Sequence, residues 1–389
     1  MELILFLAGV FLATYLIGKL LERIKIPWIF SALLIGLALA AYNPFKEITG
    51  SPSFKLLAEL GMYFMLFIIG FELDFKKIKK NGGFIAKTTI AIILSESLVG
   101  TFLLHYVFNY SWMISGLVSI SFATVGEAML LPILDEFKLT KTKLGQTILG
   151  IGVLDDLVEI ITIILVSLLL GFATGHTEIK ILFFFGILAL LFAMAYGLSR
   201  WKNQVRKLNY GYESFFLFII FFIFLFIGIG KYIESAPLGA LLAGVALKSF
   251  IPDKKLKTIE NEIRTMAYGF FAPIFFLWVG VDTDVAYIIK YPLMIILIML
   301  MVNLTKVTTS YLMGRNVLGS RESIIMGISL CVKFSTSIVI IKILFENGFI
   351  QSELYSILVG TTILFKFIVP SLLSFLLKRW NISPRKYAS

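Results

Sequence analysis

The chain has 389 residues, of which 59% are hydrophobic and 15% are charged, and its formal net charge is +11. Soluble domains carry about 25% charged residues, so this composition excludes a soluble globular protein. It predicts an all-α polytopic membrane protein, built as one integral domain across residues 1–389 with no soluble regulatory domain. The lone cysteine excludes an intrachain disulfide, and two histidines at the ends of apolar segments argue against a zinc site.

Apolar stretches of about 20 residues predict thirteen membrane-spanning helices. The first stretch has no basic residue before it and no small-residue cleavage site after it, so we expect a retained helix rather than a signal peptide. The second and ninth stretches are short, and we expect them to tilt or to lie partly within the bundle. In chain order the predicted helices span about residues 2–21, 28–42, 54–71, 84–104, 112–134, 145–170, 180–199, 213–230, 236–250, 263–281, 286–314, 322–345 and 353–377.

The distribution of lysine and arginine among the loops predicts the orientation of the chain. The loops that follow odd-numbered helices and the C-terminal tail contain 24 of these residues when Lys248 and Arg264 at adjoining helix ends are included. The other loops contain four when Lys180 and Lys290 at adjoining helix ends are included. We therefore predict a multi-pass protein of the cell membrane with its N-terminus outside and its C-terminus in the cytoplasm. Because this orientation accounts for the basic residues, they do not indicate a nucleic-acid partner.

Two adjacent aspartates and a glutamate interrupt the apolar helix predicted at 145–170, in the sequence GIGVLDDLVEI at 150–160. A charge near the bilayer centre costs about 2.5–3.5 kcal/mol on insertion scales, so such groups are expected to face a cavity or one another. Adjacent helix residues point about 100° apart, so one of Asp155 and Asp156 can face a cavity while the other meets a neighbouring helix. We expect Lys306 to pair with Asp155. The alternative is that this pair only locks two helices together.

Other ionisable residues inside the predicted helices are less specific. Glu159 and Glu96 suit structural hydrogen bonding or helix packing as well as a role in transport. Lys342 and Lys366 have long apolar stems, and we expect both to extend their ammonium groups towards the membrane interface. The alternative for Lys366 is a deeper position.

The predicted helix at 112–134 contains signs of an interruption. Thr124 and Gly126 lie in the sequence Ser-Phe-Ala-Thr-Val-Gly-Glu at 121–127, and Pro132 follows. A break in the middle of the membrane exposes backbone groups that are useful for binding ions only where the segment lines a cavity.

Several stretches together resemble one family, and the likeness covers nearly the whole chain. They are Ile26-Pro-Trp-Ile-Phe-Ser-Ala-Leu-Leu-Ile-Gly36, Phe67-Ile-Ile-Gly-Phe-Glu-Leu-Asp74, Phe122-Ala-Thr-Val-Gly126, Gly152-Val-Leu-Asp-Asp156, Pro237-Leu-Gly-Ala-Leu-Leu-Ala-Gly244, Gly269-Phe-Phe-Ala-Pro-Ile-Phe-Phe276 and Val279-Gly-Val-Asp282. In combination they resemble the cation/proton antiporters of the Asp-Asp type, the second large cation:proton antiporter family. Lys306 falls where electrogenic members of that family place a lysine.

The resemblance implies an inverted-repeat fold with crossed discontinuous helices, in a homodimer whose protomers each have a dimerisation domain and a moving core domain. The core exchanges protons for Na⁺, or for another monovalent cation such as Li⁺ or K⁺, by elevator-like alternating access. Carried over by position, Asp156 is the principal carboxylate for cation and proton. Asp155 pairs with Lys306 and opens that pair when an ion arrives, and Thr124 helps to line the site.

Two residues depart from the pattern of the family. Glu127 adds a further acid at the interruption, and Lys333 stands in Cys331-Val-Lys-Phe-Ser-Thr-Ser337, where relatives tend to carry an Arg-Gly-Glu-like stretch. Our hypothesis is that Glu127 and Lys333 pair between the two crossing helices and stabilise or tune the core. If they do not pair, we expect them to alter the stoichiometry or the choice of ion.

The residues themselves also suggest a mechanism. A carboxylate in a narrow cavity gains either a proton or a cation, and competition for one alternating site is sufficient for exchange. If Lys306 also titrates, two protons are exchanged per cation and transport is electrogenic. Oxygen ligands suit hard monovalent cations, and no cofactor or resident metal is expected.

The alternatives are a passive monovalent cation channel and a transporter-derived sensor. An enzyme such as an intramembrane aspartyl protease is disfavoured, because the aspartates are adjacent on one helix.

Overall fold

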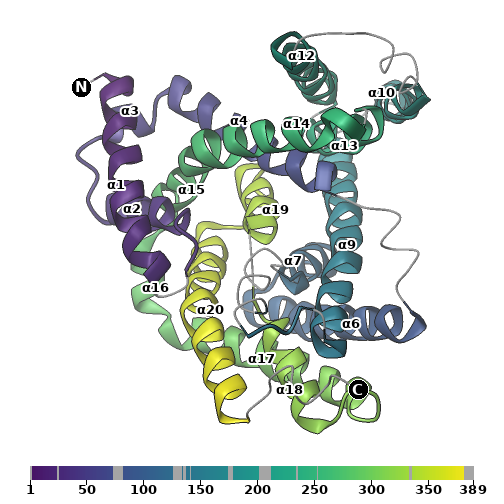
Figure 1. Ribbon diagram of the computed structural model, residues 1–389. Coiled ribbons are helices and arrows are strands. Elements are labelled where there is room, and N and C mark those ends of the chain that lie inside the picture. Colours follow the sequence, from purple (N-terminus) through teal and green to yellow (C-terminus); the bar gives the residue numbers. More distant parts are fainter. Residues whose placement is uncertain are drawn as a thin grey trace. The chain divides into compact units, whose positions relative to one another are not determined.

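The computed structural model describes residues 2–23, 26–72, 82–125, 134, 137–140, 142–173, 178–200, 212–233, 235–251, 253–332 and 335–380. For some helical residues, Asp156 among them, it describes the backbone but not the side chain. All regular structure in this part of the chain is helical (Figure 1). An all-helical architecture is expected of a chain this apolar, because a helix satisfies its backbone hydrogen bonds within one segment.

The helices follow one another closely along the chain. The elements are α1 (Leu3–Arg23), α2 (Phe30–Ala41), α3 (Lys46–Thr49), α4 (Pro52–Glu72), α6 (Gly83–Phe108), α7 (Trp112–Ala123), α9 (Lys143–Ala173), α10 (Glu178–Arg200), α12 (Tyr212–Lys231), α13 (Ala236–Phe250), α14 (Asp253–Met266), the π-helix η1 (Ala267–Phe271), α15 (Ala272–Val281), α16 (Val285–Lys290), α17 (Pro292–Gly314), α18 (Ser320–Ser329), α19 (Ser335–Glu346) and α20 (Ser352–Arg379).

Each of the thirteen predicted spans overlaps a helix of this set, and seven helices of the described part are long and apolar enough to cross a membrane. The exact number of crossings stays a prediction. Four spans differ in detail. The helix expected at 112–134 ends at Ala123, that at 322–345 is divided into α18 and α19, and that at 263–281 contains the five-residue π-helix. The fourth, 286–314, is interrupted at Tyr291, because Pro292 has no N–H with which to continue a helix.

The chain forms two compact units. Unit 1 comprises residues 1–16, 29–73 and 163–281, and unit 2 comprises residues 17–28, 74–162 and 282–389. The division between them falls within α1 and within α9.

In unit 1 the main contact is between α4 and α13, and α15 packs against α2 and α4. The α4–α13 contact depends on Gly244, where a Cβ atom would lie only 2.1 Å from the carbonyl oxygen of Phe67 and 2.6 Å from the backbone nitrogen of Phe71. A glycine is therefore needed for the two backbones to approach so closely.

In unit 2 the helix α6 packs against α7 and α17, and α17 also packs against α18 and α20. One face of α6 is apolar and exposed at every fourth residue, namely at Ile90, Leu94, Leu98 and Phe102. Residues four apart lie on the same face of a helix, so this exposed row is the face that suits lipid. The opposite face, which contains Glu96, is buried.

We predict that Gly244→Ala destabilises unit 1 by about 1–3 kcal/mol, the cost typical of overpacking, because the added methyl group meets backbone atoms of α4 that cannot rotate away. Thermal melting of the purified protein in detergent measures the effect. The control is Gly228→Ala on α12, where a Cβ meets no atom within 4 Å. Equal melting temperatures for both variants would contradict the packing argument.

Candidate functional site

The candidate site is built around the end of α7. This helix ends at Ala123, and Thr124 adopts an extended conformation with φ −68° and ψ 159°. The Thr124 hydroxyl donates to the carbonyl oxygen of Ser121 at 3.0 Å and shares a hydrogen bond of 3.0 Å with the hydroxyl of Ser337 on α19. The interruption predicted at Thr124 is therefore present, and its side chain links the end of α7 to α19.

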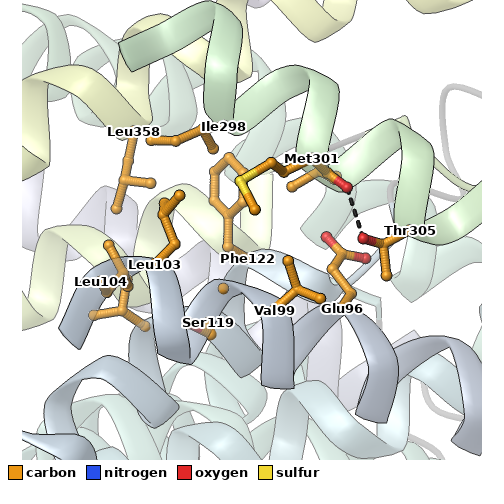
Figure 2. Close-up of a pocket in the computed structure, with 13 residues that line it drawn as sticks. Glu96, Val99, Leu103, Leu104, Ser119, Phe122, Ile298, Met301, Thr305 and Leu358 are labelled. Carbon is orange, nitrogen blue, oxygen red and sulfur yellow. Dashed lines mark hydrogen bonds between the residues drawn. The ribbon is translucent and has the colours of Figure 1, made fainter. Parts of the chain in front are cut away.

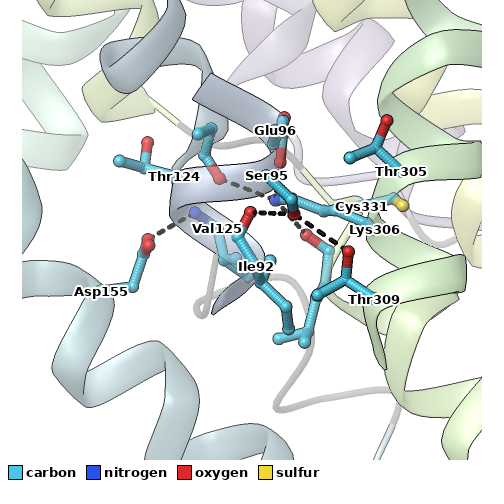
Figure 3. Close-up of polar contacts among 12 residues, drawn as sticks. Ile92, Ser95, Glu96, Thr124, Val125, Asp155, Thr305, Lys306, Thr309 and Cys331 are labelled. Carbon is cyan, nitrogen blue, oxygen red and sulfur yellow. Dashed lines mark hydrogen bonds and ion pairs between the residues drawn. The ribbon is translucent and has the colours of Figure 1, made fainter. Parts of the chain in front are cut away.

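Asp155 binds the backbone immediately after this interruption. Its Oδ2 atom accepts a hydrogen bond of 2.6 Å from the backbone N–H of Val125, and the residue is 1% exposed (Figure 3). Helix α9 supplies the carboxylate from a sequence position 30 residues away. A carboxylate bound to a backbone N–H is a charge-assisted hydrogen bond, which is stronger than one between neutral groups.

Lys306 on α17 satisfies the carbonyl ends of two helices. Its ammonium nitrogen donates to the carbonyl oxygen of Ala123, the last residue of α7, at 2.7 Å, and to that of Leu330, directly after α18, at 2.8 Å. Terminal carbonyl groups of a helix have no partner within the helix and carry partial negative charge. A cation at this position therefore stabilises both interruptions at once.

The third contact of the Lys306 ammonium is an ion pair with Glu96. The Nζ and Oε2 atoms are 3.1 Å apart, and the two side chains are 0% and 4% exposed. Figure 3 shows Lys306 near the end of α7, while Asp155 from α9 reaches the N–H of Val125, two residues beyond Ala123.

Close packing places these helices together. On α18 a Cβ atom at Gly327 would lie 2.6 Å from the Cα atom of Val307, so glycine lets α18 approach α17 directly beside Lys306. The hydroxyl groups of Ser95 on α6 and Thr309 on α17 share a hydrogen bond of 2.9 Å. Both contacts fix the helix that carries Lys306 against its neighbours.

The structure gives Lys306 an acidic partner that the sequence did not predict. The ion pair that it records for Lys306 is with Glu96, whereas Asp155 interacts with Lys306 electrostatically and binds the Val125 N–H. The expected pair between Asp155 and Lys306 stays a prediction. Glu96, which the sequence left undecided between packing and transport, lies in the centre of the cluster. Its position opposite the exposed row of α6 was the signal available in the sequence.

Several predicted site residues lie wholly or partly outside the described part of the chain. This applies to the side chain of Asp156 and to Glu127 and Lys333, so the hypothesis that Glu127 pairs with Lys333 stays a prediction. Glu159 is buried on α9, one turn beyond Asp155.

A small cavity lies beside Glu96 (Figure 2). Its volume is about 30 Å³, and helices α6, α7, α17 and α20 contribute its walls. Glu96, Ser119 and Thr305 supply polar groups, and the other walls are largely apolar, with Phe122 and Met301 among them. A water molecule needs about 10–15 Å³ of such space, so the cavity has room for one or two. Among the described residues, no cluster of three His, Cys, Asp or Glu suggests a resident metal.

The expectation that Lys342 and Lys366 reach towards the membrane interface stays a prediction, and both side chains are buried inside the protein. Lys342 is 0% exposed and forms ion pairs with Asp282 and with Glu346, the latter at 2.8 Å. Its ammonium also lies 5.5 Å from the ring centre of Tyr355. Lys366 on α20 is likewise buried. The carboxylates and the aromatic ring around the Lys342 ammonium offset the cost of burying its charge.

The comparison with protein families agrees with this geometry. The family described as "sodium/hydrogen exchanger, transmembrane" matches residues 8–379 of the chain. The chain belongs to this family. Its membership confirms the resemblance to cation/proton antiporters and places it among membrane transporters rather than enzymes.

Individual curated relatives match most of the chain. This chain is 26% identical to "Probable Na(+)/H(+) antiporter 3" of Methanocaldococcus jannaschii, with 92% of each chain covered. It is 24% identical to "Na(+)/H(+) antiporter" of Enterococcus hirae, covering 97% of this chain and 99% of that protein. The solved structure of the sodium proton antiporter MjNhaP1 from M. jannaschii at pH 8 has a similar fold, with a TM-score of 0.63 at 18% identity, over 97% of this chain and 96% of that one.

We predict that Lys342→Met destabilises unit 2, because Asp282 and Glu346 lose the cation between them. Burial already raises the pKa of Asp282 above its ordinary value, although Lys342 opposes this. Removing one partner of a buried pair costs about 3–5 kcal/mol. We expect less here, since the Asp282 and Glu346 side chains are 30% and 22% exposed. Thermal melting measures the loss, with the exposed Lys290→Met as control. An unchanged melting temperature in Lys342→Met would show that the ion pairs contribute nothing.

Proposed function

We propose that this protein is a secondary active antiporter that exchanges protons for Na⁺, or for another monovalent cation such as Li⁺ or K⁺, across the cell membrane. The observation that carries the proposal is the buried Asp155 carboxylate bound at the interruption after α7, in a chain of the sodium/hydrogen exchanger family. The names of the M. jannaschii and E. hirae relatives support the same activity.

The exchange follows from competition for a carboxylate site. A bare carboxylate in a low-dielectric cavity is costly, so it takes up either a proton or a cation. Asp156 is the principal carboxylate in this proposal, and Asp155 and the Thr124 hydroxyl add oxygen ligands, which hard cations prefer. If the site opens to one side of the membrane at a time, each cation that leaves is replaced by protons. No cofactor takes part.

The division of the chain supports an elevator-like mechanism. Of the described residues, those that are both charged and buried all belong to unit 2, namely Glu96, Asp155, Glu159, Lys306, Lys342 and Lys366. Unit 2 thus contains the chemistry of the site, and in this proposal it is the core that moves. Unit 1 then forms the dimerisation domain of a homodimer. The N-terminus lies outside and the C-terminus in the cytoplasm, as the loop charges predict.

We predict that Asp156→Asn abolishes cation-dependent proton movement in proteoliposomes, because the neutral amide cannot take up the exchanged proton and has no negative charge to attract the cation. Na⁺, Li⁺ and K⁺ are added in turn, and a pH-sensitive dye reports proton movement. The control is Glu47→Gln, which removes an exposed carboxylate of unit 1. We expect the control to exchange cations at the wild-type rate.

The same assay separates the alternatives. No dye response to any cation, from folded and inserted wild-type protein, would overturn the antiporter and favour a transporter-derived sensor. A response that appears only when charge is allowed to flow freely across the membrane would indicate a passive cation channel. Full activity in Asp156→Asn would refute the role of that carboxylate while leaving exchange itself intact.

We further propose that exchange is electrogenic, with two protons moved per cation. Such a cycle transfers net charge, so an imposed membrane potential is expected to speed Na⁺-driven exchange in one direction and slow it in the other. A potential set by a K⁺ gradient and valinomycin tests this with Na⁺ as the substrate. Rates that do not respond to the potential would establish an electroneutral cycle.

A further inference from the structure

We propose that Glu96 is a positioning residue for the exchange reaction. Acting as the counter-ion of Lys306, it holds the ammonium group in its observed place and so leaves the Asp155 carboxylate available to the transported cation. This inference rests on the proposed function and adds a residue to it. It would explain how a lysine and a cation share one buried site without competing for the same carboxylate.

Three contacts hold the Lys306 ammonium group in place. Its ammonium nitrogen contacts the Ala123 and Leu330 carbonyl oxygens at 2.7 and 2.8 Å and Glu96 Oε2 at 3.1 Å. The two carbonyl groups are dipoles and carry no net charge. Of these three contacts, Glu96 is therefore the one that neutralises the buried cation, whose isolated burial would be very costly.

Asp155 forms a separate hydrogen bond with the backbone of the interruption. Its Oδ2 atom accepts from the Val125 N–H at 2.6 Å, on the segment that follows α7. Lys306 binds the carbonyl group of Ala123, two residues before Val125 (Figure 3). The lysine therefore binds a backbone acceptor of the interruption, and the aspartate binds a backbone donor. The ammonium group is held at the carbonyl end, where a partial negative charge attracts it.

The charges of this cluster do not cancel. Its described part contains the Lys306 ammonium, the carboxyl groups of Glu96 and Asp155, and the buried thiol of Cys331. With both carboxylates ionised and the thiol neutral, the cluster carries one net negative charge. This charge adds to that of Asp156, the principal carboxylate of the proposed function, in attracting the transported cation. Without Glu96, Lys306 would neutralise Asp155, and Asp156 alone would attract the cation.

The surroundings of Glu96 make this role testable by substitution. Glu96 borders the cavity of about 30 Å³ with Thr305, so glutamine of nearly the same shape fits (Figure 2). The hydrogen bond between Ser95 and Thr309 already joins α6 to α17. Glu96→Gln thus removes the charge while the contact between these helices is kept.

The experiment measures exchange in proteoliposomes as a function of Na⁺ concentration. In Glu96→Gln we expect the apparent KM for Na⁺ to rise by about tenfold or more, within the range typical of coupling between sites, because Lys306 now neutralises Asp155. The maximal rate should change less, and Glu96→Asp should restore most of the affinity. The matched control is Ser97→Ala, the adjacent buried position on α6, which should behave as wild type.

A binding measurement without transport tests the charge argument. A cation that binds the folded protein raises its melting temperature. We expect Na⁺ to raise the melting temperature of the wild type in detergent, and to raise that of Glu96→Gln less at equal concentration. In the double variant Glu96→Gln/Lys306→Gln, we expect Na⁺ to raise the melting temperature as it does in the wild type. A merely structural role for Glu96 would lower all melting temperatures without changing their dependence on Na⁺.

The outcomes are distinct from those for the proposed function. If the wild type exchanges Na⁺ and Glu96→Gln has an unchanged KM, or loses only maximal rate, the positioning role is overturned. A double variant that fails to recover Na⁺ binding overturns it as well. If the wild type itself shows neither exchange nor Na⁺ binding, the proposed function fails instead.

Discussion

The contact on which the site depends is that between the Lys306 ammonium and the carbonyl ends of two interrupted helices. Backbone groups released by a break in a membrane helix must find partners inside the protein, because the bilayer core supplies none. One lysine from a third helix serves both α7 and α18. Its positive charge suits the partial negative charge of helix C-termini, so a single side chain makes the two interruptions possible in the same place.

The rest of the site follows from the need to compensate that lysine and the groups beyond it. Glu96 neutralises the ammonium, and Asp155 binds the N–H of Val125. Positive charge thus lies against carbonyl groups, and negative charge lies against an N–H group and against the lysine. The arrangement requires α6, α7, α9, α17 and α18 to be held in register. Gly327 and the hydrogen bond between Ser95 and Thr309 provide close contacts that do this without further charges.

The sequence predicted well those features that depend on local pattern. Apolar length located the spans, and the Thr124 segment marked the end of α7, because both depend on residues close together in the chain. The partner of Lys306 depends instead on how four helices pack. A buried lysine can neutralise any of several acids on neighbouring helices, and spacing along one helix does not choose among them. For the same reason the sequence did not predict the ion pairs of Lys342. One partner, Asp282, follows α15, and the other, Glu346, lies on the same helix as the lysine.

The two units differ in what stabilises their interiors. The described interior of unit 1 is largely apolar and contains no buried charged side chain, and α4 and α13 meet at glycine with backbone against backbone. The described interior of unit 2 contains every buried charged side chain of the described part, and two of them, Lys306 and Asp155, bind the backbone at broken helix ends. Apolar packing loses little when lipid replaces one neighbour, whereas a buried charge must keep its partners wherever it goes. If the site moves through the membrane, Lys306 must therefore move together with Glu96 and the helix ends that it binds, as one body. Grouping all of them in one compact unit meets that requirement.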